Sequence, residues 1–216
     1  MTTATAEDTK AQLVAAAEVL FAERGIEAVS LREINRAANQ ANASALQYHF
    51  GDRAGLVRAV LRKHHPDVEA RRSALLDAYD GAGDDDLRAL AAALVQPLAA
   101  KLDDPDGGRA YLRVLAELAQ RPDPVTETGP PGDRRDSVNR WRRTVEPLLD
   151  PDATKILHAR FTAIRFAYGE LARRAMAAPR RDDRLFTSHL IDLVVALLSA
   201  SPSPATARLI EKRRRR

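Results

Sequence analysis

The sequence predicts an all-α protein of about nine helices, and three observations support this fold class. Apolar side chains recur every three or four residues along most of the chain, the spacing that gathers them on one face of a helix. Runs that alternate apolar and polar residues, as half-buried strands do, are hard to find. Segments rich in proline and glycine divide the helical pattern, and no repeat of fixed period appears.

The first two expected helices carry clear start and stop signals. Over residues 6–24 the apolar positions repeat at helical spacing, and Gly25 ends the pattern. Ser30 then stands three residues before Glu33, which is the spacing of a capping box. This pair predicts a second, short helix that runs through about Ala38.

The helical pattern continues beyond this point with interruptions at prolines. A helix is expected to begin near Asp52 and to break or kink at Pro66, and a further segment restarts behind it. Pro97 predicts another kink. Residues 121–136 contain four prolines and two glycines and are expected to form a mobile loop. The other helical segments are expected at 67–79, 87–102, 107–120, 137–149, 152–178 and 184–200.

Composition excludes several classes of protein. The chain has no cysteine, which excludes disulfides, iron–sulfur clusters, thiolate zinc sites and cysteine nucleophiles. Its first ten residues lack the pattern of a signal peptide. The longest strongly apolar run, residues 193–200, is far shorter than the roughly 20 residues that a membrane helix needs. We therefore expect a cytoplasmic protein that has no membrane partner.

The positive charge of the chain lies at its C-terminal end. The formal net charge is +4, yet residues 208–216 alone carry six basic side chains and one acidic side chain. The rest of the chain is slightly negative, so the overall charge does not identify a nucleic-acid-binding protein. Residues 202–216 are expected to be a basic, disordered tail, which could also add non-specific attraction to phosphates.

The stretch NQANASALQYHFGDR, residues 39–53, differs from the helical sequence on either side of it. Two short helices, at 30–38 and about 44–49, are separated by turn-forming residues and therefore predict a helix-turn-helix. In that motif the second helix enters the major groove of DNA and the first braces it. Asn39 can adopt the left-handed backbone conformation that the turn needs, and Asn42 or Ser44 can cap the second helix.

These residues carry a resemblance to a known family. The segment SLREINRAANQANASALQYHFGDRAGLVRAVL (30–61), preceded by QLVAAAEVLFAERGIEAV (12–29), resembles the DNA-binding domain of the TetR/AcrR family of bacterial transcriptional regulators. The resemblance covers about the first 60 residues. Asn39 stands where the family usually has glycine, and the turn is one residue longer than the commonest pattern. The resemblance implies a helix-turn-helix DNA-binding domain over residues 1–65, with its motif at about 30–50.

Side chains in and around this motif suit contact with double-stranded DNA. The amide of Gln47 can pair with adenine, and the small side chains before it let the helix approach base edges closely. Tyr48 and His49 can donate hydrogen bonds to phosphates, and Arg53 can neutralise one. By position, the resemblance implies base contacts at Ala43, Ser44, Ala45 and Gln47, and phosphate contacts at Ser30, Arg32, Tyr48, His49 and Arg53.

Other interpretations of the motif remain open. Leu46 and Phe50 are expected to point inward, but Tyr48 and Phe50 could both be core aromatics of a helical hairpin. Residues 1–55 also carry seven acidic side chains against five basic ones, which counts mildly against DNA binding. The acidic residues lie mainly in or near the first helix, away from the reading helix.

The resemblance implies that residues 66–201 form a helical domain that binds a small-molecule effector and dimerises. In the last two long helices, apolar residues at helical spacing suit a four-helix interface with a second subunit, although intramolecular core is the alternative. The expected interface residues are Leu157, Phe161, Ile164, Leu171, Leu190, Val194 and Leu197. The candidate effector-pocket residues are Gln96, Tyr111, Glu117, Trp141, Arg165 and Tyr168, each of which could instead be ordinary packing or surface.

Nothing in the sequence indicates a cofactor or a catalytic site. His64 and His65 are adjacent, so on a helix they point in different directions, and no carboxylate pair at ligand spacing accompanies them. No metal site is therefore expected. Trp141 lies in a strongly basic segment and is expected to be half exposed. We find no nucleophile with its base, no phosphate-binding glycine loop and no paired catalytic carboxylates, so the chain is not expected to be an enzyme.

The sequence therefore predicts a homodimeric transcriptional regulator. It would act as a repressor that a small-molecule effector releases from a palindromic operator, although activation remains possible. The alternative is a helical small-molecule-binding or scaffold protein whose N-terminal helices have lost specific DNA reading. The identity of the effector and the sequence of the operator are not predicted.

Overall fold

The computed structural model describes residues 6–40, 45–83, 86–121 and 136–215. Within these ranges the chain forms eleven α-helices, two short 3₁₀ helices and no strand, which confirms the predicted fold class. The α-helices are α1 Ala6–Arg24, α2 Leu31–Ala37, α3 Ala45–Phe50, α4 Arg53–Ala82, α5 Leu87–Ala99, α6 Gly108–Ala119, α7 Ser137–Val145, α8 Pro151–Lys155, α9 Ala159–Met176, α10 Arg184–Ser199 and α11 Pro204–Arg214. The 3₁₀ helices are Ala100–Leu102 and Glu146–Leu148.

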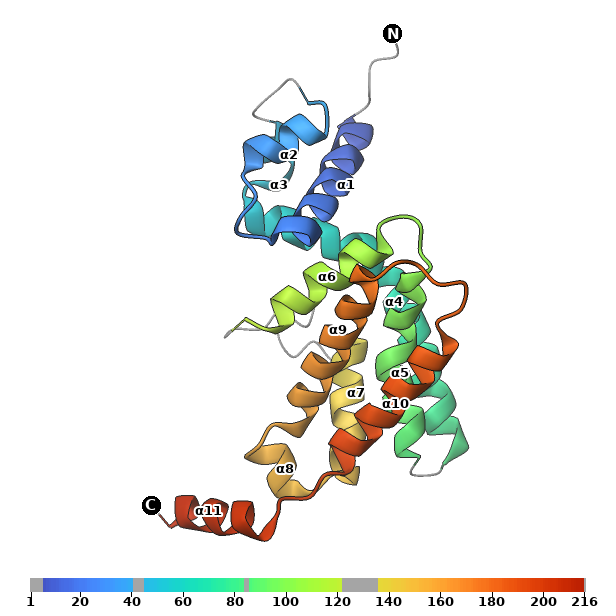
Figure 1. The fold of residues 1–216 in the computed structure, drawn as a ribbon, viewed down its shortest axis with the longest axis vertical. Coiled ribbons are helices and arrows are strands. Elements are labelled where there is room, and N and C mark those ends of the chain that lie inside the picture. The colour runs from blue at the N-terminus through green and yellow to red at the C-terminus, as the bar shows by residue number, and fades with distance from the viewer. Residues whose placement is uncertain (1–5, 41–44, 84–85, 122–135, 216) are drawn as a thin grey trace.

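Helices α1, α2 and α3 form a small bundle at one end of the molecule (Figure 1). The expected start and stop signals are present. Gly25 adopts a left-handed conformation (φ 89°) directly after α1, and Ser30 and Glu33 form the predicted capping box at the start of α2. Asp52 caps α4 by accepting a hydrogen bond from the backbone N–H of Gly55. Local sequence signals therefore place the helices of this bundle correctly.

Helix α4 is continuous through Pro66, so the break expected there is wrong. The helix extends from Arg53 to Ala82. Pro66 itself lies on an exposed side of the helix. The boundary expected after residue 65 therefore lies inside one helix. The same helix packs against α1 and α3 and also against α5, α6 and α7, so it joins the two parts of the molecule.

The larger part of the molecule is built around α5, α6 and α9. Helix α6 packs against α9 and also against α1, while α5 lies between α4 and α10 (Figure 1). One continuous cluster of buried apolar side chains extends through both parts, from Leu13 in α1 to Leu198 in α10. A change in the packing of α6 can therefore reach α1 directly.

Two further differences from the expected helices lie near the C-terminus. The helix expected over 152–178 is divided, because His158 has a left-handed backbone (φ 55°) and precedes the first residue of α9. The tail expected to be disordered forms α11. Ser203 caps this helix, Ile210 is only 4% exposed, and Arg214 forms an ion pair with Asp152.

No single helix in the described part of the chain is long and apolar enough to cross a membrane. Helices α10 and α11, which meet at a bend of 50°, together meet that requirement by length and composition alone.

Candidate nucleic-acid interface

The turn after α2 has the hydrogen bonds of a Schellman motif. The backbone N–H of Gln40 donates to the carbonyl of Asn35 at 2.9 Å, and that of Asn39 donates to the carbonyl of Arg36 at 3.1 Å. Asn39 itself adopts the predicted left-handed conformation, with φ of 53°. Asparagine tolerates this conformation better than most residues, so it can stand at a position where glycine is common. The chain is thereby turned sharply between α2 and the segment that leads to α3.

Helix α3 has one face anchored in the core and the other exposed. Leu46 is 1% exposed and Phe50 packs half-buried against the same core, as the sequence predicts. Gln47 is exposed, and Tyr48 is 84% exposed. Tyr48 is therefore not a core aromatic, and the alternative interpretation holds only for Phe50. The ring of His49 lies edge-on to that of Tyr48, with 5.1 Å between the ring centroids.

Several of the predicted contact residues lie outside the described part of the chain. Asn42, Ala43 and Ser44 fall in the gap before α3. Ala45 is the first residue of α3 in the described backbone. The base and capping roles expected at these four positions stay predictions.

Ser30 is engaged in its capping box, and Arg32, two residues further along the chain, is exposed. The Ser30 hydroxyl donates to Glu33 at 2.7 Å, and the Ser30 backbone N–H donates to the same carboxylate oxygen at 2.8 Å. The pKa of Glu33 is lowered to about 2, first by this backbone hydrogen bond, then by the Arg24 side chain and by the Ser30 hydroxyl. Glu33 is therefore ionised at neutral pH. Because the pKa is lowered, the stabilisation that Glu33 gives α2 is present above its ordinary pKa of 4.5 and is lost as the pH falls toward 2.

Arg53 has a structural partner that the sequence did not reveal. Its guanidinium donates hydrogen bonds to the carbonyls of Ile26 and Val29, the latter at 2.7 Å. These carbonyls lie in the connection between α1 and α2, so Arg53 ties the start of α4 to that connection. The side chain stays 30% exposed. The predicted phosphate contact is therefore compatible with the structure but is not the only role of Arg53.

Much of the negative charge in the first 55 residues is paired. Glu18 is 1% exposed and bonds to Lys63 and His64, while Glu33 forms an ion pair with Arg24 at 2.7 Å. The other acidic residues with described partners are Glu7 (paired with Lys10), Glu27 (with Arg53 and Arg121) and Asp52 (the cap of α4). None of these residues lies on α3, so the excess of acidic residues in the sequence does not make α3 itself an anionic surface.

Two acidic residues connect the bundle of α1, α2 and α3 to the rest of the molecule. Glu18, on α1, accepts from Lys63 at 2.9 Å and lies 2.5 Å from the Nε2 atom of His64, and both partners lie on α4. Glu117, on α6, accepts a hydrogen bond from the backbone N–H of Ile26 at 3.1 Å. Glu117 was expected to line an effector pocket, but its carboxylate instead holds the connection between α1 and α2.

The candidate pocket residues have different surroundings in the described part of the chain. Tyr111, Trp141 and Tyr168 are buried in the core, and Trp141 is fully buried rather than half exposed. The indole N–H of Trp141 donates to the carbonyl of Leu90 at 2.7 Å, which explains how this side chain can be buried within a basic segment. Burial raises the pKa of both tyrosines, so both hydroxyls stay protonated at neutral pH.

Two of the candidate pocket residues lie near the surface. Gln96 lines a groove of about 450 Å³ between α5 and the start of α10. Tyr111 and Tyr168, by contrast, are buried in the core. Arg165 is half-buried on α9. Its role in effector binding stays a prediction.

Four of the seven expected interface residues are core residues of the subunit itself. Ile164, Leu171, Leu190 and Val194 are each at most 1% exposed, so the intramolecular alternative holds for them. Burial is decided by which helices surround a face, and helical spacing alone does not reveal that. Leu157 is exposed, and Phe161 and Leu197 are half-buried. These three can still reach a second subunit.

The sequence matches a known family over its N-terminal part. The family described as "Bacterial regulatory proteins, tetR family" matches residues 13–60, which contain α2 and α3 and most of α1. No curated protein is detectably similar in sequence.

Solved structures of low sequence identity share the overall fold. An HlyIIR mutant protein is 15% identical with a TM-score of 0.56, and the match covers 93% of this chain and 100% of that one. The ketosteroid transcriptional regulator KstR2 of Mycobacterium tuberculosis is 17% identical with a TM-score of 0.53, over 89% of this chain and 95% of that one. NalD of Pseudomonas aeruginosa is 22% identical with a TM-score of 0.51, over 91% and 100%.

The family match and the geometry of α2, its turn and α3 point to the same segment of the chain. The Schellman turn, the anchored face of α3 and its exposed polar face all lie within the matched residues. Over residues 13–60, the chain therefore matches the tetR family of bacterial regulatory proteins.

Proposed function

We propose that this protein is a sequence-specific DNA-binding transcriptional regulator rather than an enzyme, and that it acts as a repressor released from a palindromic operator by a small-molecule effector. The observation that carries the proposal is the exposed polar face of α3, where Gln47 and Tyr48 project from a helix that Leu46 and Phe50 anchor to the core. A helix held in this way can enter the major groove without losing its own packing. Helix α2 braces it from behind.

The proposed division of the chain follows from this role. Residues 1–65 carry the DNA-binding domain and 66–201 the effector-binding and dimerisation domain, joined by the continuous helix α4. Helices α4 and α6 are the physical route between the two, because Lys63 and His64 bond to Glu18 and Glu117 holds the N–H of Ile26. An effector that displaces α6 would therefore move the connection between α1 and α2. Such coupling is typically worth about 1–3 kcal/mol.

The proposed dimer uses the exposed strips of α9 and α10, which lie side by side. Leu185, Leu193 and Leu197 lie on exposed or half-buried positions of α10, and Met176 is 68% exposed at the end of α9. Paired with their copies from a second subunit, the two helices would form a four-helix interface. A two-fold dimer calls for a near-palindromic operator, with half-sites about 34–36 Å apart or a longer multiple of that spacing.

The printed descriptions of similar structures suit a ligand-responsive regulator without naming its ligand. KstR2 is called a ketosteroid transcriptional regulator, and NalD the secondary repressor of the MexAB-OprM multidrug efflux pump. Their low identity to this chain gives no basis for transferring either role. The effector is therefore left as an unspecified small molecule.

Selection from a random-sequence duplex pool tests the proposal. The full-length protein should enrich a near-palindromic sequence, and the enriched duplex should be bound in preference to a scrambled one of equal length. A selection that enriches nothing would favour the rival function, a helical small-molecule-binding or scaffold protein without specific DNA reading.

Gln47→Ala is expected to weaken binding to the enriched operator by roughly 1–3 kcal/mol and to relax the preference at one base position. The reason is that the side-chain amide is exposed on α3 and can pair with adenine. Fluorescence anisotropy on the operator and on single-base variants measures both effects. Gln120→Ala, at an exposed position at the end of α6, is the matched control and should change neither. Unchanged affinity and preference would remove Gln47 from the base contacts.

Arg53→Ala and Arg53→Lys together separate the two roles of Arg53. Both should lower the melting temperature, because neither side chain can bond to the Ile26 and Val29 carbonyls as the guanidinium does. Only the alanine variant should lower the salt dependence of DNA binding by about one phosphate contact, because lysine keeps the charge. A salt slope that is the same in the wild type and both variants would exclude a phosphate contact.

Leu193→Glu is expected to convert the dimer into a monomer at micromolar concentration. The side chain is 37% exposed on α10, and like charges that meet across an interface cost several kcal/mol. Val19→Glu, at a 48% exposed position on α1, is the control and should stay dimeric. Sedimentation velocity distinguishes the two states. A dimeric Leu193→Glu variant would place the interface elsewhere.

A further inference from the structure

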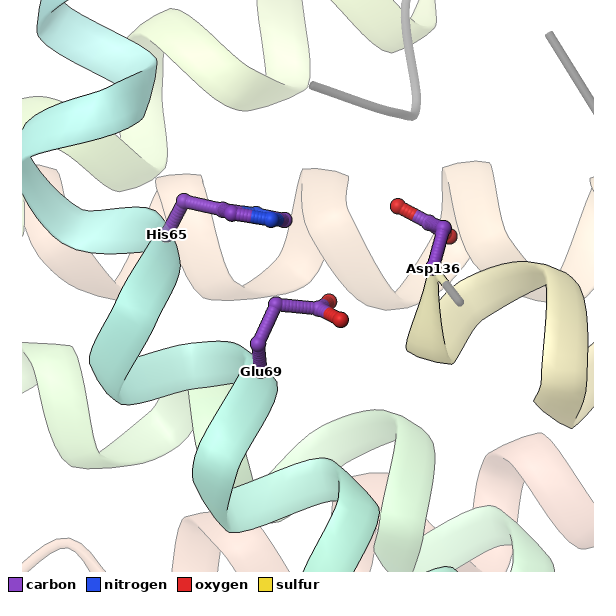
Figure 2. A group of neighbouring side chains, drawn as sticks. All are labelled: His65, Glu69 and Asp136. Carbon is purple, nitrogen blue, oxygen red and sulfur yellow. The ribbon is translucent and has the colours of Figure 1, made fainter. Parts of the chain in front are cut away.

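Three potential metal ligands converge between α4 and the start of α7. His65 and Glu69 lie four residues apart on α4, and Asp136 immediately precedes α7; their side chains point toward one another (Figure 2). One ligand atom from each residue lies within 4.8 Å of the other two. His64, by contrast, points to Glu18 and stacks on Tyr111, with 4.5 Å between the ring centroids.

We propose that His65, Glu69 and Asp136 bind a divalent transition-metal cation of the zinc class. An imidazole nitrogen and two carboxylate oxygens are ligands that zinc uses in proteins, and three protein ligands leave one or more positions for water or another ligand. Without cysteine, the chain has no thiolate ligand to offer. The cation would join α4 to α7.

Hydrogen bonds from α7 already orient both carboxylates. The Ser137 backbone N–H donates to one Glu69 oxygen at 2.9 Å, and the Ser137 hydroxyl donates to the other at 2.5 Å. The backbone N–H of Asn139 donates to one Asp136 oxygen at 3.0 Å. A carboxylate oxygen has two lone pairs, so it can accept a hydrogen bond and also bind a cation. Supporting contacts of this kind are typical of metal ligands.

The charge around the cluster also suits a cation. Glu69 and Asp136 are two acidic groups, and the Nη1 atom of the Arg72 guanidinium lies 3.6 Å from Glu69. Arg72 is buried, and its Nη2 has no hydrogen-bond partner among the residues that the structure describes. The charges of these two carboxylates, the Arg72 guanidinium and a bound divalent cation would sum to +1.

The position of the cluster would make the cation regulatory, a consequence that rests on the proposed function. Helix α4 bears His65 and Glu69 and also the residues that bond to Glu18 of α1. A cation that fixes α4 to α7 would therefore restrict the helix that joins the DNA-binding bundle to the rest of the protein. Cation binding and operator binding should then be coupled.

The test uses full-length protein freed of metal with a chelator and titrated with Co²⁺ and Zn²⁺ alone. We expect saturable binding of one Co²⁺ per subunit, visible as d–d absorption, and displacement of that absorption by Zn²⁺. Asp136→Asn should weaken Co²⁺ binding at least about tenfold. Asparagine can still cap α7, so the circular dichroism and melting temperature of this variant without metal should match the wild type. His65→Gln should abolish the absorption.

The controls test the metal site and its effect on operator binding separately. His189→Gln, at an exposed histidine of α10, should leave Co²⁺ binding unchanged. Absence of saturable binding, or binding that Asp136→Asn and His65→Gln leave intact, overturns the site. Repeating the operator titration with and without Zn²⁺ tests the coupling, and equal affinities overturn the regulatory consequence. Failure to bind any operator refutes the proposed function, while the Co²⁺ titration still decides the site.

Discussion

Trp141→Ala is expected to lower the free energy of unfolding by about 3–5 kcal/mol. The side chain is fully buried among the helices of the larger domain, and its removal leaves a large cavity in addition to the lost burial. The hydrogen bond from the indole N–H to the Leu90 carbonyl is lost as well. Urea unfolding followed by circular dichroism measures the change, since the variant has no tryptophan to report fluorescence.

Trp141→Phe is the matched control for this prediction. Phenylalanine keeps much of the apolar volume and loses the indole N–H, so it should destabilise the protein less than alanine does. If the free energy of unfolding of the alanine variant fell by less than about 1 kcal/mol, Trp141 would not be packed as described. The same position bears on function, because Trp141 belongs to α7, the helix that Glu69 contacts through Ser137.

Asp183→Ala is also expected to lower the free energy of unfolding by about 3–5 kcal/mol. Asp183 accepts two hydrogen bonds from the guanidinium of Arg174, at 2.6 and 3.1 Å, and the two side chains are only 6% and 4% exposed. Removal of the carboxylate leaves a buried positive charge without its counter-ion. Because the pair joins the end of α9 to the start of α10, the proposed dimer should weaken too.

The control for Asp183→Ala removes both charges at once. The double variant Arg174→Met, Asp183→Leu buries no unpaired charge and is expected to be closer in stability to the wild type than Asp183→Ala is. Urea unfolding of the wild type, of Arg174→Met, of Asp183→Leu and of the double variant gives the coupling energy. A coupling energy near zero would contradict the buried ion pair.

The parts of the fold that the sequence predicted depend on neighbours in the chain. The capping box of Ser30 and Glu33, the left-handed Asn39 and the cap at Asp52 each involve residues at most a few positions apart. Their effect on the backbone is decided locally, so one sequence is sufficient. The helix-turn-helix was predicted on these signals, and the same residues match the family.

The parts that the sequence missed depend on contacts between distant segments. Pro66 does not break α4, because it lies on a side of the helix that stays exposed. Arg53 bonds to carbonyls that precede it by 27 and 24 residues, and Asp136 meets His65 through the packing of α7 on α4. Residues such as Ile164 have the spacing of an interface, yet other helices of the same subunit cover them.

The most direct test of the account is fluorescence anisotropy of the full-length protein on a duplex from the region upstream of its own gene. Salt is varied, and scrambled duplex is the competitor. We expect tight binding that survives the competitor and that Gln47→Ala weakens by roughly 1–3 kcal/mol. If the enriched duplex from random selection and the upstream duplex are both bound no better than scrambled DNA, α3 does not read sequence and the account is wrong.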